Sequence, residues 1–164
     1  MRCLFVLVLF VASWSAATPV QALDVCSLVP RSEIAAAIGE TISSAKLDGP
    51  DVDQASGSRT WTCTYGLANG ILAVSVAEFA SASAARNFIT LDNLKKELKD
   101  VEIQVTEEKG IGDRSFLLRD EEGLALTVLK GARYYAVTAG GQKLAPDRLK
   151  AALRKIATML LPTL

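Results

Sequence analysis

The first hydrophobic block of the chain is short and nearly unbroken, unlike every later segment. Residues 4–12 are apolar, Arg2 precedes them, and small residues and Pro19 follow. Residues 20–22 read Val-Gln-Ala, a small-x-small pattern typical of signal-peptidase cleavage. A membrane span needs about 20 apolar residues, roughly twice this core. The pattern therefore predicts a cleaved signal peptide over residues 1–22 and a mature start at Leu23, with a retained membrane anchor as the alternative.

Lipidation is a second alternative for the amino-terminal region. A bacterial lipoprotein signal has small residues directly before its acceptor cysteine, whereas Leu23-Asp24-Val25 precede Cys26, and Cys3 lies too early. No second long apolar run follows the leader, so no membrane span is expected after cleavage. We expect a soluble periplasmic or secreted protein.

Alternation of polar and apolar residues predicts two β-hairpins. Residues 60–68 and 71–79 flank Asn69-Gly70, a strong two-residue turn signal. With Ala68 opposite Ile71, the first hairpin has an apolar face, consisting of Trp61, Cys63, Tyr65, Leu67, Leu72, Val74 and Val76. Residues 124–130 and 133–139 form the second hairpin around Gly131-Ala132, with Leu124, Leu126, Val128, Tyr135 and Val137 on its apolar face.

Helical spacing predicts three helices. The first covers residues 30–38 between Pro30 and Gly39, and the second runs from Ser81 or Ser83 to about Lys99. The third begins at Pro146 and ends before Pro162, with Leu149, Leu153, Ile156 and Leu160 facing inward.

Three weaker strands complete the pattern, at residues 41–47, 101–105 and 114–119, and residues 48–59 are predicted to be a loop. The predicted order is α-βββ-α-ββββ-α over residues 23–164. Short neighbouring strands with tight turns indicate a single α+β domain, an antiparallel sheet with helices packed on one side. At the level of topology, the two halves suggest an αβ duplication.

Composition excludes several classes of function. The chain contains 18 basic and 18 acidic residues and no histidine. Since Arg2 leaves with the leader, the mature chain has a slight acidic excess, which is unlike a nucleic-acid-binding domain. Histidine is the commonest metal ligand and general base, so we predict no metal site, no cofactor and no catalytic residue.

Cys26 and Cys63 are the two cysteines of the mature chain. In an exported protein such a pair is expected to form a disulfide, although two separate thiols are the alternative. The predicted hairpin register turns Cys63 toward the core, within reach of Cys26.

Several short motifs resemble a family of small secreted bacterial domains of unknown function. Residues 26–30 read Cys-Ser-Leu-Val-Pro, with Glu33, Ala36, Ile38 and Gly39 following, and residues 61–65 resemble that family's second-cysteine strand. Residues 109–113 and the hairpin over 126–137 are also similar. The resemblance implies a Cys26–Cys63 bridge and an α/β repeat, but no established chemistry. Many members of that family are lipoproteins, whereas this chain lacks the lipidation signal. The helix-plus-sheet layout is also similar to secreted β-lactamase inhibitory proteins.

Other motifs are interpreted as structural. Gly110-Ile111-Gly112 precedes a predicted strand rather than a helix, which favours a tight turn over a phosphate loop. The carboxylate groups 107–108, 120–122 and Asp51/Asp53 lie in predicted turns and are expected to be solvated. The basic side chains of the last helix are expected to form a solvated face; they are Lys143, Arg148, Lys150, Arg154 and Lys155. Trp61 and Tyr65 are assigned to the core rather than to a stacking site.

The candidate contact patch consists of Leu129, Lys130, Arg133 and Tyr134, because Tyr134 lies on the opposite face from Tyr135. Whether the third helix covers Tyr134 is left open. We expect a non-catalytic binding or protein-interaction module whose partner is a protein or small molecule of the cell envelope. The alternatives are an inhibitor of an extracellular enzyme that uses the loop over residues 48–59, and an enzyme with lysine or carboxylate chemistry.

Overall fold

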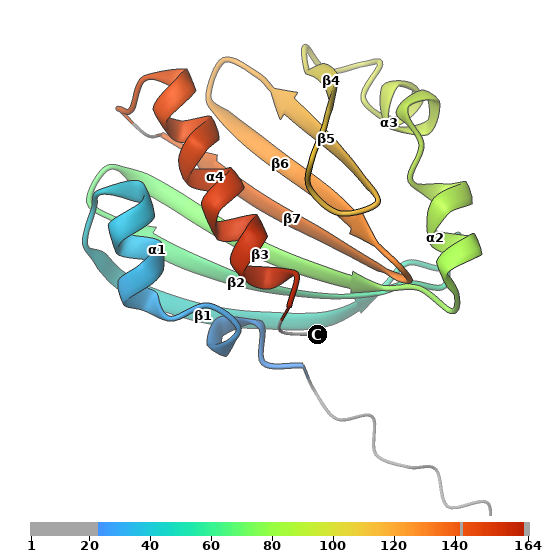
Figure 1. Ribbon diagram of the computed structural model, residues 1–164, viewed down its shortest axis with the longest axis horizontal. Helices are drawn as coiled ribbons and strands as arrows, with labels where there is room; N and C mark the ends of the chain where they lie inside the picture. Colours follow the sequence, from blue (N-terminus) through green and yellow to red (C-terminus); the bar gives the residue numbers. More distant parts are fainter. Residues whose placement is uncertain (1–22, 142, 163–164) are drawn as a thin grey trace, which may run out of the picture.

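A computed structural model describes residues 23–141 and 143–162. The predicted leader, residues 1–22, lies outside the described residues. The described part is an α+β fold built on one antiparallel sheet, as the hydrophobic pattern predicted (Figure 1).

The sheet has seven strands in the order β1-β2-β3-β7-β6-β5-β4. Two antiparallel meanders form it, and the pairing of β3 with β7 joins them. The strands are β1 (Ile42–Val52), β2 (Arg59–Leu67), β3 (Gly70–Glu78), β4 (Gln104–Glu108), β5 (Arg114–Arg119), β6 (Gly123–Lys130) and β7 (Arg133–Gly140).

Helices pack on both faces of this sheet, rather than on one side as predicted, because the strands direct side chains into a hydrophobic cluster on each face. The 3-10 turn η1 (Val25–Ser27), α1 (Arg31–Ile38) and α4 (Pro146–Leu160) cover the larger cluster. It contains the predicted apolar faces of both hairpins and the inward residues of the last helix. The helices α2 (Ala82–Phe88) and α3 (Leu91–Glu97) cover a smaller cluster on the other face, around Phe116 and Leu129.

The predicted first hairpin forms, but its turn lies one residue earlier than expected. Leu67 pairs with Gly70 and Tyr65 with Leu72, so each residue of β2 pairs with a β3 residue two positions earlier than predicted. A type I′ turn at Asn69-Gly70 requires positive φ at both residues, and only Gly70 has it, at 119°. The Asn69 N–H instead donates to Glu40 Oε2 at 3.0 Å. Because side chains alternate with a period of two, this shift leaves the predicted apolar face unchanged.

The predicted second helix is two helices. Thr90 Oγ1 accepts a hydrogen bond from the Asn93 N–H at 3.1 Å and so caps α3. The Asn93 side chain donates to the Phe88 carbonyl at 2.8 Å, at the end of α2. These bonds satisfy the backbone groups that the break exposes, as caps do.

Two strand boundaries also differ from the prediction. β1 continues to Val52 through an irregularity at Asp48/Asp51, so the predicted loop over residues 48–59 is reduced to residues 53–58. β4 begins at Gln104 rather than Val101. The Val101 N–H donates to the Leu98 carbonyl at 3.2 Å. This local turn bond uses a backbone N–H that a strand would need for pairing.

Candidate ligand-binding site

The four residues of the predicted contact patch do not form one exposed surface. Leu129 is 1% exposed and lies in the smaller cluster, where Tyr134 packs against it. Lys130 pairs with Asp113 at 3.0 Å, and Arg133 pairs with Glu78 at 2.7 Å. The α2–α3 side of the sheet, rather than the C-terminal helix, accounts for the burial of Tyr134.

Burial changes the acidity of Tyr134. Desolvation raises the pKa of its phenol from 10.0 to about 12, with a smaller lowering contribution from Thr127. The hydroxyl therefore stays neutral well above the pH at which an exposed tyrosine ionises.

Cys26 and Cys63 form a disulfide, which ties η1 to β2. Trp61 and Tyr65 are buried beside it, as the alternation predicted. The Tyr65 hydroxyl donates to the Cys26 carbonyl at 3.4 Å. This region is a packed core and offers no stacking surface.

The Gly110-Ile111-Gly112 segment is a tight turn before β5, as predicted. Gly112 has φ +63°, and a Cβ at this position would lie 2.6 Å from the Leu129 carbonyl oxygen. Asp113 then accepts from the Gly131 N–H at 2.8 Å and from Lys130 Nζ at 3.0 Å. The Gly131 bond, followed by the Lys130 bond, lowers the pKa of the Asp113 carboxyl. The motif thus links the turn before β5 to the β6–β7 turn.

The prediction of solvated carboxylates is wrong for Glu108. Its side chain is 14% exposed and contacts Lys150 Nζ at 2.6 Å and Arg154 Nη1 at 2.9 Å. Two of the basic residues assigned to a solvated face thus fasten α4 to the sheet edge. Strand alternation explains the difference, since Glu108 points toward α4 while Glu107 points to the opposite face.

Three adjoining hollows surround the turn between β5 and β6. We call the first the apolar hollow; its volume is about 250 Å³. Its floor is a row of directly paired residues, Leu118, Ala125 and Thr138, on β5, β6 and β7. Ile103, in the segment between α3 and β4, forms a wall. Ala125 and Thr138 are short, so they leave space that larger side chains would fill.

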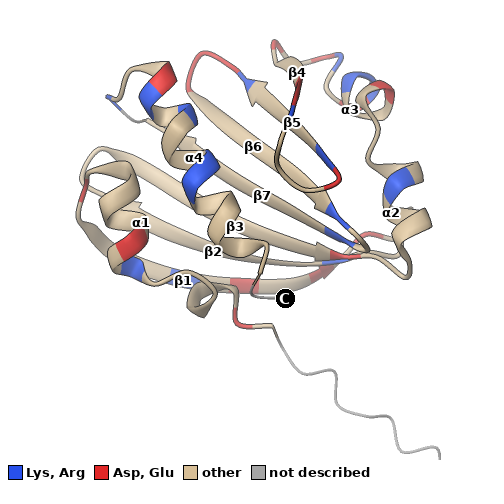
Figure 2. Cartoon of the chain, in the orientation of Figure 1, with Lys and Arg blue, Asp and Glu red and all other residues tan. Residues whose placement is uncertain are grey.

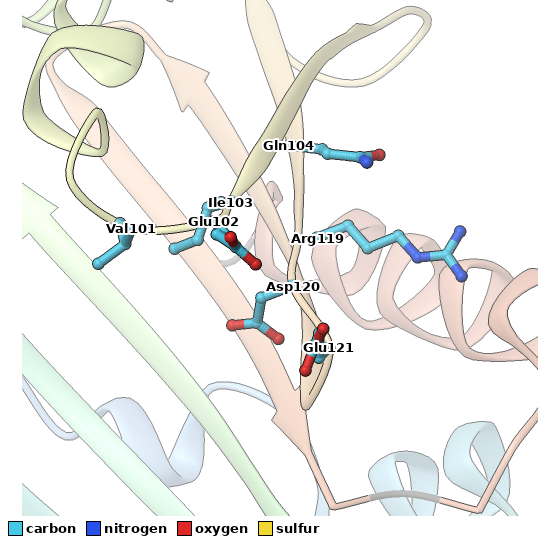
Figure 3. A pocket seen from close by; sticks show the side chains of 7 residues that line it. All are labelled: Val101, Glu102, Ile103, Gln104, Arg119, Asp120 and Glu121. Atoms are coloured by element: carbon cyan, nitrogen blue, oxygen red, sulfur yellow. The ribbon is translucent and has the colours of Figure 1, made fainter.

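The acidic hollow adjoins the apolar hollow and shares Ile103, Arg119 and Asp120 with it. It is an open depression of about 620 Å³, also lined by Glu102 and Glu121. Figure 3 shows these carboxylates gathered on one side, while the Arg119 guanidinium points away from them. The turn between β5 and β6 is correspondingly red in Figure 2.

Asp120 is held in place by its own turn. Its Oδ1 accepts from the Glu122 N–H at 2.8 Å and from the Gly123 N–H at 2.6 Å. Gly123 permits the close approach of β6 to β7 here, since an added Cβ would lie 3.2 Å from the Gly140 Cα. The third hollow, of about 110 Å³, lies on the α4 side of the turn beside Leu144, Pro146 and Leu149.

Sequence reasoning missed this site. The sequence predicts solvated carboxylates for Asp120-Glu121-Glu122, and no sequence signal shows that Ile103 lies beside this run. Apart from buried Trp and Tyr, the buried polar side chains among the described residues are Ser58, Ser115 and Thr127, none of them ionisable at neutral pH. The same residues contain no group of three or more Cys, Asp and Glu arranged to hold a metal ion. No helix among them is long and apolar enough to cross a membrane.

Comparison with known proteins identifies the fold alone. No family model matches the sequence, and no curated protein matches it. Among solved structures, the extracellular domain of PknH from Mycobacterium tuberculosis is similar, with a TM-score of 0.52 and 14% sequence identity. The match covers 82% of this chain and 93% of that one.

Proposed function

We propose that this chain is an exported, non-catalytic binding domain that takes up a small-molecule ligand beside the β5–β6 turn. The observation that carries this proposal is the apolar hollow over Leu118, Ala125 and Thr138. Ligand sites are concave, mostly apolar, and have a few polar groups at their rim, and this hollow with its acidic neighbour fits that description.

Export is supported by the amino-terminal pattern and by the Cys26–Cys63 disulfide, since disulfides persist in oxidising compartments. The similar solved structure is also an extracellular domain. The small-molecule role is preferred to a protein-docking role because Leu129 is buried and Tyr134 is partly buried against the same cluster, so the two do not form an exposed patch. β1 takes up residues 48–52 of the loop proposed for an inhibitor, and no specific observation favours that alternative.

A fragment screen tests the proposal. The mature protein is screened by ligand-observed NMR against a mixed library of neutral and charged fragments. Ala125→Leu fills the floor of the apolar hollow, and the control Ala151→Leu makes the same change at an exposed position of α4. We expect hits that bind the wild type and the control but not Ala125→Leu. Equal binding by all three proteins, or no hits, would overturn the proposal.

A further inference from the structure

We infer that the ligand is an organic cation, whose apolar body occupies the apolar hollow and whose positive charge lies among Glu102, Asp120 and Glu121. This inference rests on the proposed function and adds the chemical class of the ligand. It follows from the size of the apolar hollow, its continuity with the acidic hollow and the charges at that junction.

The size of the apolar hollow limits the apolar body. Its volume of about 250 Å³ lies just below the range of about 300–1,000 Å³ typical of sites for drug-sized ligands. One aromatic ring or a short alkyl chain can rest on Leu118 and Ala125, against Ile103.

The charge of the ligand follows from carboxylates that form no ion pair. Arg119 also lines both hollows, but its guanidinium points away from these carboxylates (Figure 3). Some other acidic residues are paired: Glu78 with Arg133, Glu108 with Lys150 and Asp113 with Lys130. Within residues 23–141 and 143–162, no salt bridge involves Glu102, Asp120 or Glu121. A ligand cation at the rim would supply the missing partner, which is charge complementarity at a binding site.

The geometry favours an organic cation over a metal ion. A bound Ca²⁺ or Mg²⁺ needs several oxygen ligands at about 2.0–2.6 Å. Glu102 belongs to the segment before β4, whereas Asp120 and Glu121 belong to the β5–β6 turn, and these groups are not arranged as a metal site in the described chain. An ammonium group interacts with carboxylates at longer distances, and its apolar body gains contact with the neighbouring hollow.

Three probes that share one ring test the inference: benzylammonium, benzyl alcohol and benzoate. Their dissociation constants are measured by NMR titration at low ionic strength on the mature protein. We expect benzylammonium to bind roughly fivefold tighter than benzyl alcohol, because each exposed ion pair contributes a modest amount, and benzoate to bind weakest. Added salt should weaken the binding of benzylammonium alone, since it screens exposed charges.

Matched variants locate the charge effect. Glu102→Gln/Glu121→Gln removes two charges from the acidic hollow and should weaken benzylammonium binding about fivefold without changing benzyl alcohol binding. The control, Asp92→Asn/Glu107→Gln, removes two exposed charges that do not line either hollow. It should leave both constants within about twofold, because distant exposed charges are screened.

The outcomes separate this inference from the proposed function. If benzyl alcohol or benzoate binds as tightly as benzylammonium and Ala125→Leu abolishes that binding, the cation is rejected and the binding site stands. If both double variants have the same effect, general surface charge explains the result and the inference fails. If no probe binds up to its solubility limit, the inference is likewise overturned, while the mixed fragment screen still decides the proposed function.

Discussion

Tyr134 illustrates how burial raises the pKa of a single side chain. Its phenol packs in the smaller cluster beside Leu129, and desolvation raises its pKa to about 12. Burial also raises the pKa of Tyr65 and of Tyr135. The neutral form of each is favoured in the folded state, so their contribution to stability is present below pH 10 and is lost as the pH rises through the folded-state pKa.

Ultraviolet titration of the phenol groups tests this prediction. In the folded wild type we expect no tyrosine to ionise with the ordinary pKa of 10.0, and Tyr134→Phe to remove the component near pH 12. Protein unfolded in guanidinium is the control and should titrate near pH 10 throughout. A native component near pH 10 that disappears in Tyr134→Phe would contradict the burial of this residue.

Gly112 and Gly57 form a matched pair with nearly equal φ angles. Gly112 has φ +63° and lies against the Leu129 carbonyl, whereas Gly57 has φ +66° and nothing within 4 Å of an added Cβ. We expect Gly57→Ala to cost about 1 kcal/mol from backbone strain alone. Gly112→Ala should cost about 2–4 kcal/mol, because the clash with packed strands adds to that strain. Urea unfolding measures both, and equal losses would contradict the close approach.

Strand alternation made the buried residues predictable. Trp61, Tyr65 and Tyr135 were assigned to the core from period-two patterning, and all are buried. Glu108 could not be found in this way, because its partners Lys150 and Arg154 are more than 40 positions away in sequence. A carboxylate is buried only where distant cations pair with it, and the local hydrophobic pattern does not predict such pairs.

Glu108 at the end of β4 attaches α4 to the sheet edge through Lys150 and Arg154. Glu108→Gln leaves Lys150 and Arg154 facing a neutral amide, and we expect a loss of about 1–2 kcal/mol, between the values for exposed and buried pairs. Glu33→Gln is the control, because Glu33 lies 3.7 Å from Lys155 Nζ with both side chains about half exposed. It should cost less than about 0.5 kcal/mol. Equal losses in urea unfolding would show that Glu108 does not fasten the helix.

At the scale of elements, turns and caps decided which predictions succeeded. The β6–β7 hairpin formed in the predicted register, since Gly131 supplies the positive φ that its turn requires. The predicted helix over residues 81–99 has helical spacing throughout, yet Thr90 and Asn93 provide caps that stabilise a break. Hydrophobic periodicity does not detect such a break, because the two short helices keep their apolar residues facing the same cluster.

The disulfide joins η1 to β2, and the described residues contain no other cysteine. It closes a separation of 37 residues, for which loop entropy gives a stabilisation of up to about 4 kcal/mol. We expect Cys26→Ser/Cys63→Ser, exported and beginning at Leu23, to lose about 2–4 kcal/mol in urea unfolding. Unfolded, unreduced wild type should show no reactive thiol. Two reactive thiols in protein recovered from the oxidising compartment would contradict the bridge.

For the whole molecule, the sequence predicted the α+β class and antiparallel sheet, but not the order of the strands or the location of the site. The pairing of β3 with β7 brings the two meanders together and leaves β4 at an edge. Within the second meander, the pairing of Gln104 with Arg119 places Ile103 and Glu102 beside the β5–β6 turn. The site therefore arises from the register of neighbouring strands, which no motif in the chain encodes.

The most direct test of the binding proposal is amide chemical-shift mapping of the mature protein during titration with benzylammonium. If the ligand occupies the hollow beside the β5–β6 turn, the largest changes will be at Ile103, Ala125 and Thr138, and Ala125→Leu will remove them. Changes centred elsewhere, for example along α4, or changes that persist in Ala125→Leu, would contradict this location for the binding site.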